Sequence, residues 1–311
     1  MSKILVLGGH GFVGTNLCKS LRVTRHQVFP VSRKNGVDLK DFSSTRKCFL
    51  KIKPNAIINC AASVGSVHYV SAHQADIVND NMLINLNCYK AAAQVCPEAR
   101  IVNPIANCAY PAAANVFKEV DLFKNDVHQS VYSYGHAKRM LYVLAYCYNK
   151  QYQIRSVNFL IPNLFGPGDR TDPNKVHAMD GLIIRMIQSK KRMDKEFEIW
   201  GSGKPVREWG YIDDLTRVLI MGLTIKEDLI YPINFAQNKG YSIVESARII
   251  ARMLNYQVRF VFNTKFQDGV PVKIMDDLKF RQLFPKFKFT DHEKAIGKTV
   301  KYYLSILGKK N

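Results

Sequence analysis

Short apolar runs alternate with longer amphipathic stretches in the first half of the chain. The apolar runs are KILVL (3–7), QVFPVS (27–32), AIINC (56–60), RIVNP (100–104) and IRSVNF (154–159). Apolar residues recur at helical spacing between them, over Phe12 to Leu21, Phe42 to Lys51, Asp76 to Val95 and Tyr132 to Tyr152. Short buried strands that alternate with helices indicate crossover units. The pattern predicts an α/β fold with a Rossmann-type, doubly wound parallel sheet.

The second half of the chain mixes irregular stretches with two clear elements. YPINF (231–235) is typical of a strand, and 242–255 is typical of a helix that begins with a Ser242/Glu245 capping box. We expect a dinucleotide-binding domain over 1–162 and a smaller, mainly substrate-binding region over 163–311. The elements at about 231–255 are expected to return to the Rossmann domain.

A glycine-rich turn, GGHGFVG, follows the first predicted strand. Gly8, Gly11 and Gly14 fit the spacing that lets a backbone approach a pyrophosphate at a helix N-terminus. Glycine-rich turns are common, but this one lies between a first strand and an amphipathic helix. That context favours dinucleotide binding.

The end of the second predicted strand bears on the choice of dinucleotide. NAD sites usually place a carboxylate there for the ribose 2′-hydroxyl, whereas this strand ends in Ser32, Arg33 and Lys34. Two cations suit a 2′-phosphate, so NADP(H) is favoured and NAD(H) stays possible. The alternative is that both are ordinary surface cations of a basic protein.

The stretch YSYGHAK (132–138) places Tyr134 and Lys138 four residues apart, on one face of a predicted helix. Tyr132 is out of register with this lysine. A nearby ammonium favours the phenolate, so we expect a lowered tyrosine pKa and proton exchange with a carbonyl or alcohol oxygen. The same spacing occurs often by chance, but here it follows the fourth strand of a glycine-rich dinucleotide fold.

Together these features resemble the extended short-chain dehydrogenase/reductases that act on nucleotide sugars, and most closely the GDP-L-fucose synthase group. The resemblance covers nearly the whole chain. It is carried by GGHGFVG, CAASVGS (60–66), DIVNDNM (76–82), NCAYP (107–111), YSYGHAK, IPNLFGPGD (161–169), IWGSGKPVREWGYIDD (199–214) and DGVPVKIMD (268–276).

The resemblance implies roles for individual residues. Tyr134 and Lys138 match the proton donor and its partner, while Cys108 and His177 match the base and acid that epimerise C3 and C5. A thiolate can abstract a proton beside a ketone, and a histidine can return one at neutral pH. Taken alone, Cys108 reads as a small buried hydrophobe and His177 as a polar loop residue.

The resemblance also implies two sets of binding residues. The cofactor would contact Gly8, Gly11, Phe12, Val13, Gly14, Arg33, Lys34, Asp38, Leu39, Ala61, Ala62, Tyr134 and Lys138. The GDP-linked sugar would contact Asn163, Arg185, Trp200, Arg207 and Lys273. Guanidinium and ammonium groups suit a pyrophosphate, and an indole supplies a flat wall for a ring. Without the resemblance, Trp200 would be assigned to the core and the three cations to the surface.

Two positions depart from the family pattern. Ala106 stands where relatives carry a serine or threonine that holds the reacting sugar oxygen, so Asn107 or a water has to take that role, or the substrate is placed differently. His10 stands in the glycine turn where close relatives carry an arginine near the 2′-phosphate.

Composition argues against several classes of protein. The net charge of +20 is spread along the chain, which favours a lysine-rich surface over nucleic-acid binding, although it would also attract a pyrophosphate. Seven cysteines without close pairs argue against a disulfide framework and a metal site. No signal peptide or membrane-spanning run is seen, so we expect a cytoplasmic protein. Family resemblance adds a homodimer and a role in polysaccharide biosynthesis.

Three functions remain open at this point. The favoured one is NADP(H)-dependent reduction at C4 of a GDP-linked 4-keto sugar, with epimerisation at C3 and C5. The alternative is an NAD(P)-dependent C4 dehydrogenase of a GDP-hexose or GDP-heptose. The third is a non-catalytic member of the fold that binds NADP(H), or a basic RNA-binding derivative of it, and the Tyr134/Lys138 pair argues against both.

Overall fold

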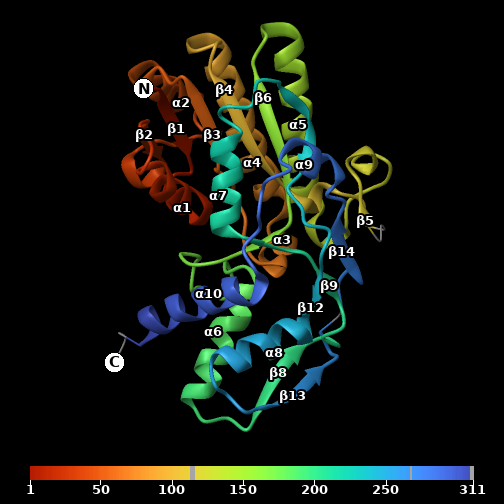
Figure 1. Ribbon diagram of the computed structural model, residues 1–311. Coiled ribbons are helices and arrows are strands. Elements are labelled where there is room, and N and C mark those ends of the chain that lie inside the picture. Colours follow the sequence, from red (N-terminus) through yellow and green to blue (C-terminus); the bar gives the residue numbers. More distant parts are fainter. Residues whose placement is uncertain (113–115, 267, 309–311) are drawn as a thin grey trace.

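A parallel sheet forms the centre of the larger of two regions (Figure 1). The computed structural model describes residues 1–112, 116–266 and 268–308. The main sheet has six strands in the order β11-β6-β4-β3-β1-β2, and every neighbouring pair is parallel. The bounds in that order are Leu229–Asn234, Ser156–Ile161, Arg100–Ala106, Ala56–Asn59, Lys3–Leu7 and Gln27–Val31. The predicted Rossmann-type fold class is confirmed.

The sheet is buried on both faces, which is why its strands read as continuous apolar runs. In β1, Ile4 and Val6 face one core cluster, while Leu5 and Leu7 face the other. Helices α1 (Phe12–Leu21) and α7 (Ile212–Met221) cover the first face. Helices α2 (Phe42–Ile52), α4 (Gln74–Val95) and α5 (Tyr132–Tyr152) cover the second.

The strand order reverses beside β1. The chain leaves β1 for β2 on one side and then returns to β3 on the other side of β1. In open parallel sheets, ligands bind outside the carboxyl ends of the strands at such a switch point. The glycine turn follows β1 directly, so it lies at this position.

The smaller region contains the remaining long helices. Helices α6 (Ala178–Lys191), α8 (Ile243–Met253) and α10 (His292–Leu307) pack on one another, and β8 (Glu196–Trp200) pairs with β13 (Arg259–Asn263). The remaining short helices and strands, from both regions, are α3 (Val67–Ala72), α9 (Leu278–Leu283), β5 (Val116–Phe117), β7 (Asn163–Phe165), β9 (Val206–Arg207), β10 (Trp209–Tyr211), β12 (Tyr241–Ser242) and β14 (Val272–Met275).

The stretch expected to return to the Rossmann domain, at about 231–255, divides between the two regions. Strand β11 joins the main sheet beside β6. Helix α8, with its capping box at Ser242 and Glu245, packs instead on α6 and α10. That part of the prediction is corrected, because the broad apolar face of α8 finds its partners on the helices of the smaller region.

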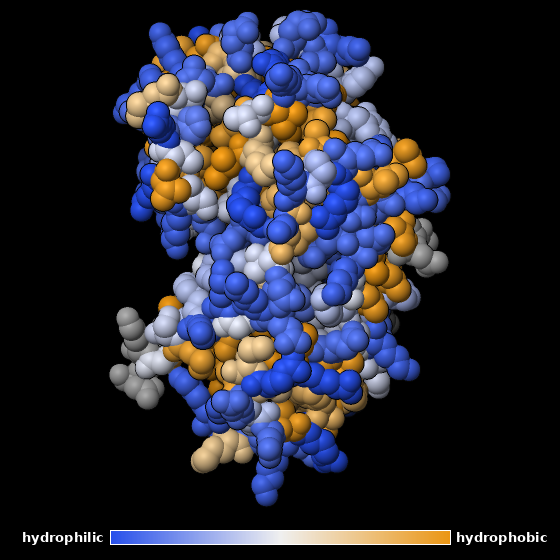
Figure 2. All heavy atoms as spheres, viewed as in Figure 1, coloured by the Kyte–Doolittle hydropathy of each residue, from blue (hydrophilic) through white to orange (hydrophobic). Residues whose placement is uncertain are grey.

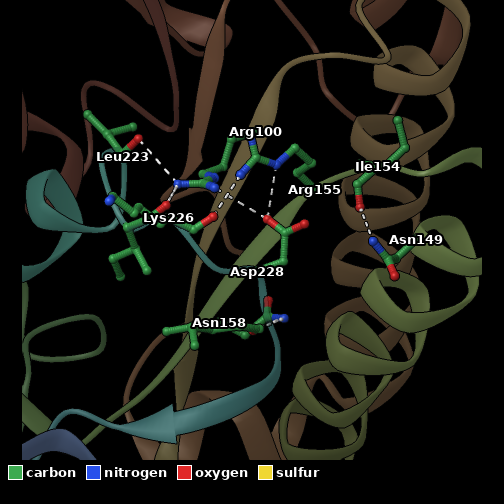
Figure 3. Close-up of polar contacts among 10 residues, drawn as sticks. Arg100, Asn149, Ile154, Arg155, Asn158, Leu223, Lys226 and Asp228 are labelled. Atoms are coloured by element: carbon green, nitrogen blue, oxygen red, sulfur yellow. Dashed lines mark hydrogen bonds and ion pairs between the residues drawn. The ribbon is translucent and has the colours of Figure 1, made fainter. Parts of the chain in front are cut away.

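An arginine cluster ties the amino ends of the strands together (Figure 3). Arg100, at the start of β4, donates to the carbonyl oxygens of Leu223 and Ile225. Its Nη2 lies 3.4 Å from Asp228 Oδ1, and the Nε of Arg155 lies 3.2 Å from the same oxygen. The cluster is at the opposite end of the sheet from the glycine turn, so it stabilises the fold rather than a ligand site.

Hydrophilic residues cover most of the face seen in Figure 2, with small apolar groups between them. Within the described ranges, none of the helices combines the length and the apolar character that a membrane span needs.

Candidate active site

The glycine turn brings β1 close to the segment after β3. Gly8 has a φ of +71°, and a Cβ on it would lie 2.8 Å from the backbone of Ala61. A Cβ on Gly14 would overlap the carbonyl oxygen of Gly8. Helix α1 then begins at Phe12 without a side-chain cap on its first N–H groups. The backbone at Gly11, Phe12 and Val13 can therefore approach and bind a pyrophosphate.

The residues after β2 fit a 2′-phosphate. Ser32 caps a short turn that holds Arg33 and Lys34, both exposed. The Oγ of Ser32 also lies 2.8 Å from Nδ1 of His10, so the glycine turn contributes a second polar group here. Of two further residues predicted to contact the cofactor, Asp38 accepts from the Lys40 N–H at 3.0 Å, and Leu39 is buried.

A cavity of about 510 Å³ opens beside these elements. Its lining residues are Arg33, Ala62, Ser63, Val64, Tyr69, Arg170, Thr171, Asp172 and Lys175. Arg33 and Ala62 were predicted from the sequence to contact the cofactor. The cavity thus joins the end of β2 and the segment after β3 to the stretch 170–175.

Tyr134 and Lys138 lie together on α5 as their spacing predicts. The Lys138 Nζ is 5.4 Å from the centre of the Tyr134 ring. Lys138 is buried, and desolvation lowers its pKa. The anchor for this part of α5 is Arg139, whose Nε donates to the Ala109 carbonyl at 2.6 Å.

The expected lowering of the Tyr134 pKa is wrong for this structure. Burial raises the pKa of the phenol well above its ordinary value, and the nearby Cys108 adds to the increase. Desolvation penalises the phenolate more than the buried Lys138 ammonium can offset at this separation. Tyr134 is therefore held in its protonated form, which is the form that can donate a proton to a carbonyl oxygen.

Cys108 lies directly against the Tyr134 helix. A Cβ on Gly135 would be 2.6 Å from the Cys108 carbonyl oxygen, so only glycine allows this approach. Burial raises the pKa of the Cys108 thiol to about 11, while Lys273 and Lys138 act in the opposite direction. Burial outweighs these cations, so the protonated thiol is the resting form of Cys108.

Asn107 is buried at the carboxyl end of β4, next to Ala106. Its Nδ2 has no hydrogen-bond partner among the described residues. An unpaired buried amide is costly, and this one lies at the carboxyl end of β4, so its nitrogen can donate to a ligand oxygen there.

His177 is held by a buried carboxylate. Asp169 Oδ2 accepts from the His177 backbone N–H at 2.8 Å and lies 2.9 Å from its Nδ1. Since a carboxylate only accepts, Nδ1 carries a proton in this contact and Nε2 stays available for exchange. The imidazole also packs on Phe12, with ring centres 5.4 Å apart.

Arg207 and Lys273 lie opposite each other on β9 and β14. Burial lowers the pKa of both groups. Arg207 donates to the carbonyl oxygens of Val206 and Val270 at 2.8 and 2.6 Å. Two partly desolvated cations side by side have the charge that phosphate oxygens pair with.

The other predicted substrate residues lie apart from this pair. Arg185 stacks on Trp200, with its guanidinium carbon 4.1 Å from the ring centre, and Trp200 stacks in turn on Phe266 at 5.0 Å. Trp200 is 49% exposed, which excludes the core assignment. Asn163 is half-buried on β7, where it pairs with Trp209 of β10. No contact within the described residues joins the Arg185–Trp200 stack to Cys108 or Tyr134.

Sequence reasoning missed three residues of this site. Gly135 lies within YSYGHAK, and Asp169 ends IPNLFGPGD, so both belong to motifs recognised in the sequence. The partner of Gly135, Cys108, is distant in the sequence, and an irregular loop separates Asp169 from its partner His177. Arg170 carried no signal, since it reads as one cation among many.

Comparison with known proteins gives a consistent picture. The NAD dependent epimerase/dehydratase family matches residues 4–232. A probable GDP-L-fucose synthase from Drosophila melanogaster is 32% identical over 98% of this chain and 98% of its own length.

Two solved structures are similar over the full chain. A GDP-L-fucose synthetase from Naegleria fowleri, bound to NADP, has a TM-score of 0.87 and 26% identity, covering 99% of this chain and 94% of its own. A GDP-mannoheptose C4 reductase from Campylobacter jejuni, with NADP bound, has a TM-score of 0.84 and 25% identity, covering 97% and 98%.

Proposed function

The chain belongs to the NAD dependent epimerase/dehydratase family, and from this premise we propose that it reduces the C4 ketone of a GDP-linked 4-keto sugar with NADPH and epimerises C3 and C5. One observation supports this above others. Gly135 packs the Cys108 backbone against the turn of α5 that carries Tyr134, and the Cys108 thiol is near enough to raise the Tyr134 pKa, so a ketone oxygen at Tyr134 has its neighbouring carbon near a thiol.

The residues around Tyr134 handle the ketone oxygen. Bound NADPH would supply the hydride to C4. Tyr134 donates the proton to the oxygen, and Lys138 stabilises the charge left on the phenol. Asn107 Nδ2 donates a hydrogen bond to the same oxygen, the task that Ala106 cannot perform.

Cys108 and His177 handle the carbons beside the ketone. The ketone acidifies the C–H bonds at C3 and C5, and the Cys108 thiolate takes the proton. Lys273 and Lys138 offset part of the increase that burial causes in the pKa of this thiol. His177 returns a proton through Nε2, with Asp169 holding the ring. The GDP pyrophosphate binds Arg207 and Lys273, and the Arg185–Trp200 stack offers a flat face to a ring.

We also propose that the protein is a homodimer and works in the cytoplasm. Leu86 on α4 and Tyr146 on α5 are exposed apolar side chains on two helices that pack side by side, which supports a homodimer through these helices. All seven cysteines are free, and the mechanism needs a reduced Cys108, so a reducing cytoplasm is the fitting compartment. A role in polysaccharide biosynthesis is part of the same proposal.

Deuterium exchange tests the proposal. With a GDP-linked 4-keto sugar and NADPH in heavy water, the product should carry deuterium at C3 or C5. Cys108→Ser should lose that label but keep some C4 reduction, because Tyr134 and the hydride path stay intact. His177→Asn should slow reprotonation and change the stereochemistry at the labelled carbons.

Other outcomes decide between the remaining functions. Reduction of the ketone without label would leave Cys108 and His177 as pocket residues of a simple reductase. Formation of NAD(P)H from a GDP-hexose or GDP-heptose with a free C4 hydroxyl would identify a dehydrogenase. NADPH binding without turnover of any nucleotide sugar would identify a binding protein.

A further inference from the structure

The segment 166–177 is fastened to the dinucleotide site at three points. The Nδ2 of Asn16, on α1, donates to the Pro167 carbonyl at 2.9 Å. The Ser66 N–H donates to the Asn174 carbonyl at 2.8 Å. His177 packs on Phe12, the first residue of α1. Elements that bind the cofactor's pyrophosphate thus also hold this segment in place.

Two cations of the segment, Arg170 and Lys175, line the cavity of about 510 Å³ that Arg33 also lines. Neither guanidinium group, of Arg33 or of Arg170, has a hydrogen bond or an ion pair with any described residue. Lys175 has a loose partner in Asp172, 3.7 Å away, and both of those side chains are more than 40% exposed. The cavity therefore brings together three cations against a single carboxylate, with two of the cations unpaired.

We propose that Arg170 and Lys175 bind a phosphate of the dinucleotide, so that the segment 166–177 forms an outer wall of the cofactor site. The inference rests on the proposed use of NADP(H). It adds two anion-binding residues that lie outside the glycine turn and outside the end of β2.

The lining of the cavity decides which ligand these cations meet. Arg33 and Ala62 belong to the predicted cofactor site, and Ser63 and Val64 continue the segment after β3. None of Tyr134, Cys108 or Lys273 lines the cavity. A phosphate of the sugar nucleotide would have to reach past the reacting groups, whereas a dinucleotide on the glycine turn already lies beside this wall. Guanidinium and ammonium groups pair strongly with phosphate oxygens.

Binding measurements test the proposal directly. We would measure dissociation constants for NADPH and NADH by protein fluorescence or calorimetry in wild type, Arg170→Met, Lys175→Met and the double variant. Loss of one charge-assisted contact should weaken NADPH binding roughly tenfold, and the double variant should be weaker still. Both side chains are exposed, so the variants should fold normally. Lys47→Met and Arg248→Met remove the same charges at exposed sites outside the cavity and should leave both constants unchanged.

The two cofactors identify the phosphate involved. If NADPH binding weakens and NADH binding does not, the contact is with the 2′-phosphate; if both weaken equally, it is with the pyrophosphate. Wild-type affinity for both cofactors in the double variant would overturn the inference while leaving the proposed function intact. Failure of wild type to bind NADPH at all would instead overturn the proposed function.

Discussion

The carbonyl oxygen of Cys108 faces Gly135 so closely that there is no room for a methyl group at that position. A Cβ at position 135 would lie 2.6 Å from that oxygen and 3.1 Å from Val127 Cβ. The residue before Gly135 is the proposed proton donor, and Cys108 is the proposed base. One backbone contact therefore sets the positions of both.

Gly135→Ala should impair reduction and epimerisation together. The added methyl forces α5 and the Cys108 turn apart, and displacing a catalytic group by about 1 Å can cost on the order of 100-fold in rate. We expect kcat to fall by roughly that factor for both C4 reduction and deuterium incorporation.

The control is Gly297→Ala, on α10, where a Cβ would meet only Met253 Sδ at 3.5 Å. Alanine is the better helix former, so this variant should keep activity and gain a few tenths of a kcal/mol or more in stability. If Gly135→Ala reduced only one of the two activities, the contact between Gly135 and Cys108 would not be what positions both Tyr134 and Cys108.

Tyr134→Phe should remove nearly all turnover while leaving NADPH affinity close to normal, because the phenol acts only in proton transfer. Steady-state kinetics and a binding titration measure the two effects separately. Tyr132→Phe is the matched control, since Tyr132 is 39% exposed and out of register with Lys138. Equal activity in wild type and Tyr134→Phe would exclude the assignment.

Replacing Arg33 and Lys34 with alanine should weaken NADPH binding more than NADH binding, by roughly 10-fold or more, since both cations face the expected 2′-phosphate. Lys47→Ala with Lys51→Ala removes two exposed charges from α2 and serves as the control. A wild-type protein that bound NADH as tightly as NADPH would contradict the hypothesis that Arg33 and Lys34 bind a 2′-phosphate.

Asn107→Ala should lower kcat by about 100-fold, as expected when a donor to a developing oxyanion is removed. Ala106→Ser in the same variant should recover part of the loss, because it restores a hydroxyl at the family's usual position. Rescue separates a hydrogen-bonding role from a packing role. If the double variant were no faster than Asn107→Ala, the unpaired Nδ2 would not be the substitute donor.

Stability should depend on pH through His292. Burial lowers the pKa of His292 from 6.5 to about 4, so the folded state holds it neutral. Because the folded-state pKa is depressed, the contribution of neutral His292 to the free energy of unfolding is complete above pH 6.5 and is lost as the pH falls toward 4. This lost free energy of unfolding amounts to about 3 kcal/mol. His292→Phe keeps the aromatic contact with Tyr241, whose ring centre is 3.9 Å away.

Thermal unfolding at several pH values between 6.5 and 4 measures this dependence. The wild-type Tm should fall across the range more steeply than that of His292→Phe. Parallel curves for the two proteins would assign the acid sensitivity to other groups.

Periodicity predicted the local elements well. Helices α1 and α5 begin and end at the predicted residues, and the predicted strands of the main sheet are present within a few residues. These elements are set by apolar spacing within one short stretch of chain, which a sequence displays directly.

Contacts between distant stretches could not be read in the same way. The apolar face of α8 does not say which helices will cover it, so its packing on α6 and α10 was missed. The Tyr134 pKa was misjudged because the spacing to Lys138 is local, whereas burial comes from the whole fold. Asp169 was quoted without a role, since only the folded loop turns it toward His177.

The close packing of the Cys108 backbone on Gly135 limits how the sugar can present its carbons to the thiol. Carbons C3 and C5 lie on opposite sides of C4, whereas Cys108 is held by a backbone contact to the helix that carries Tyr134. If Cys108 is the base for both carbons and keeps this position, the pyranose ring has to turn over between the two proton abstractions, so that the substrate rather than the base changes its orientation.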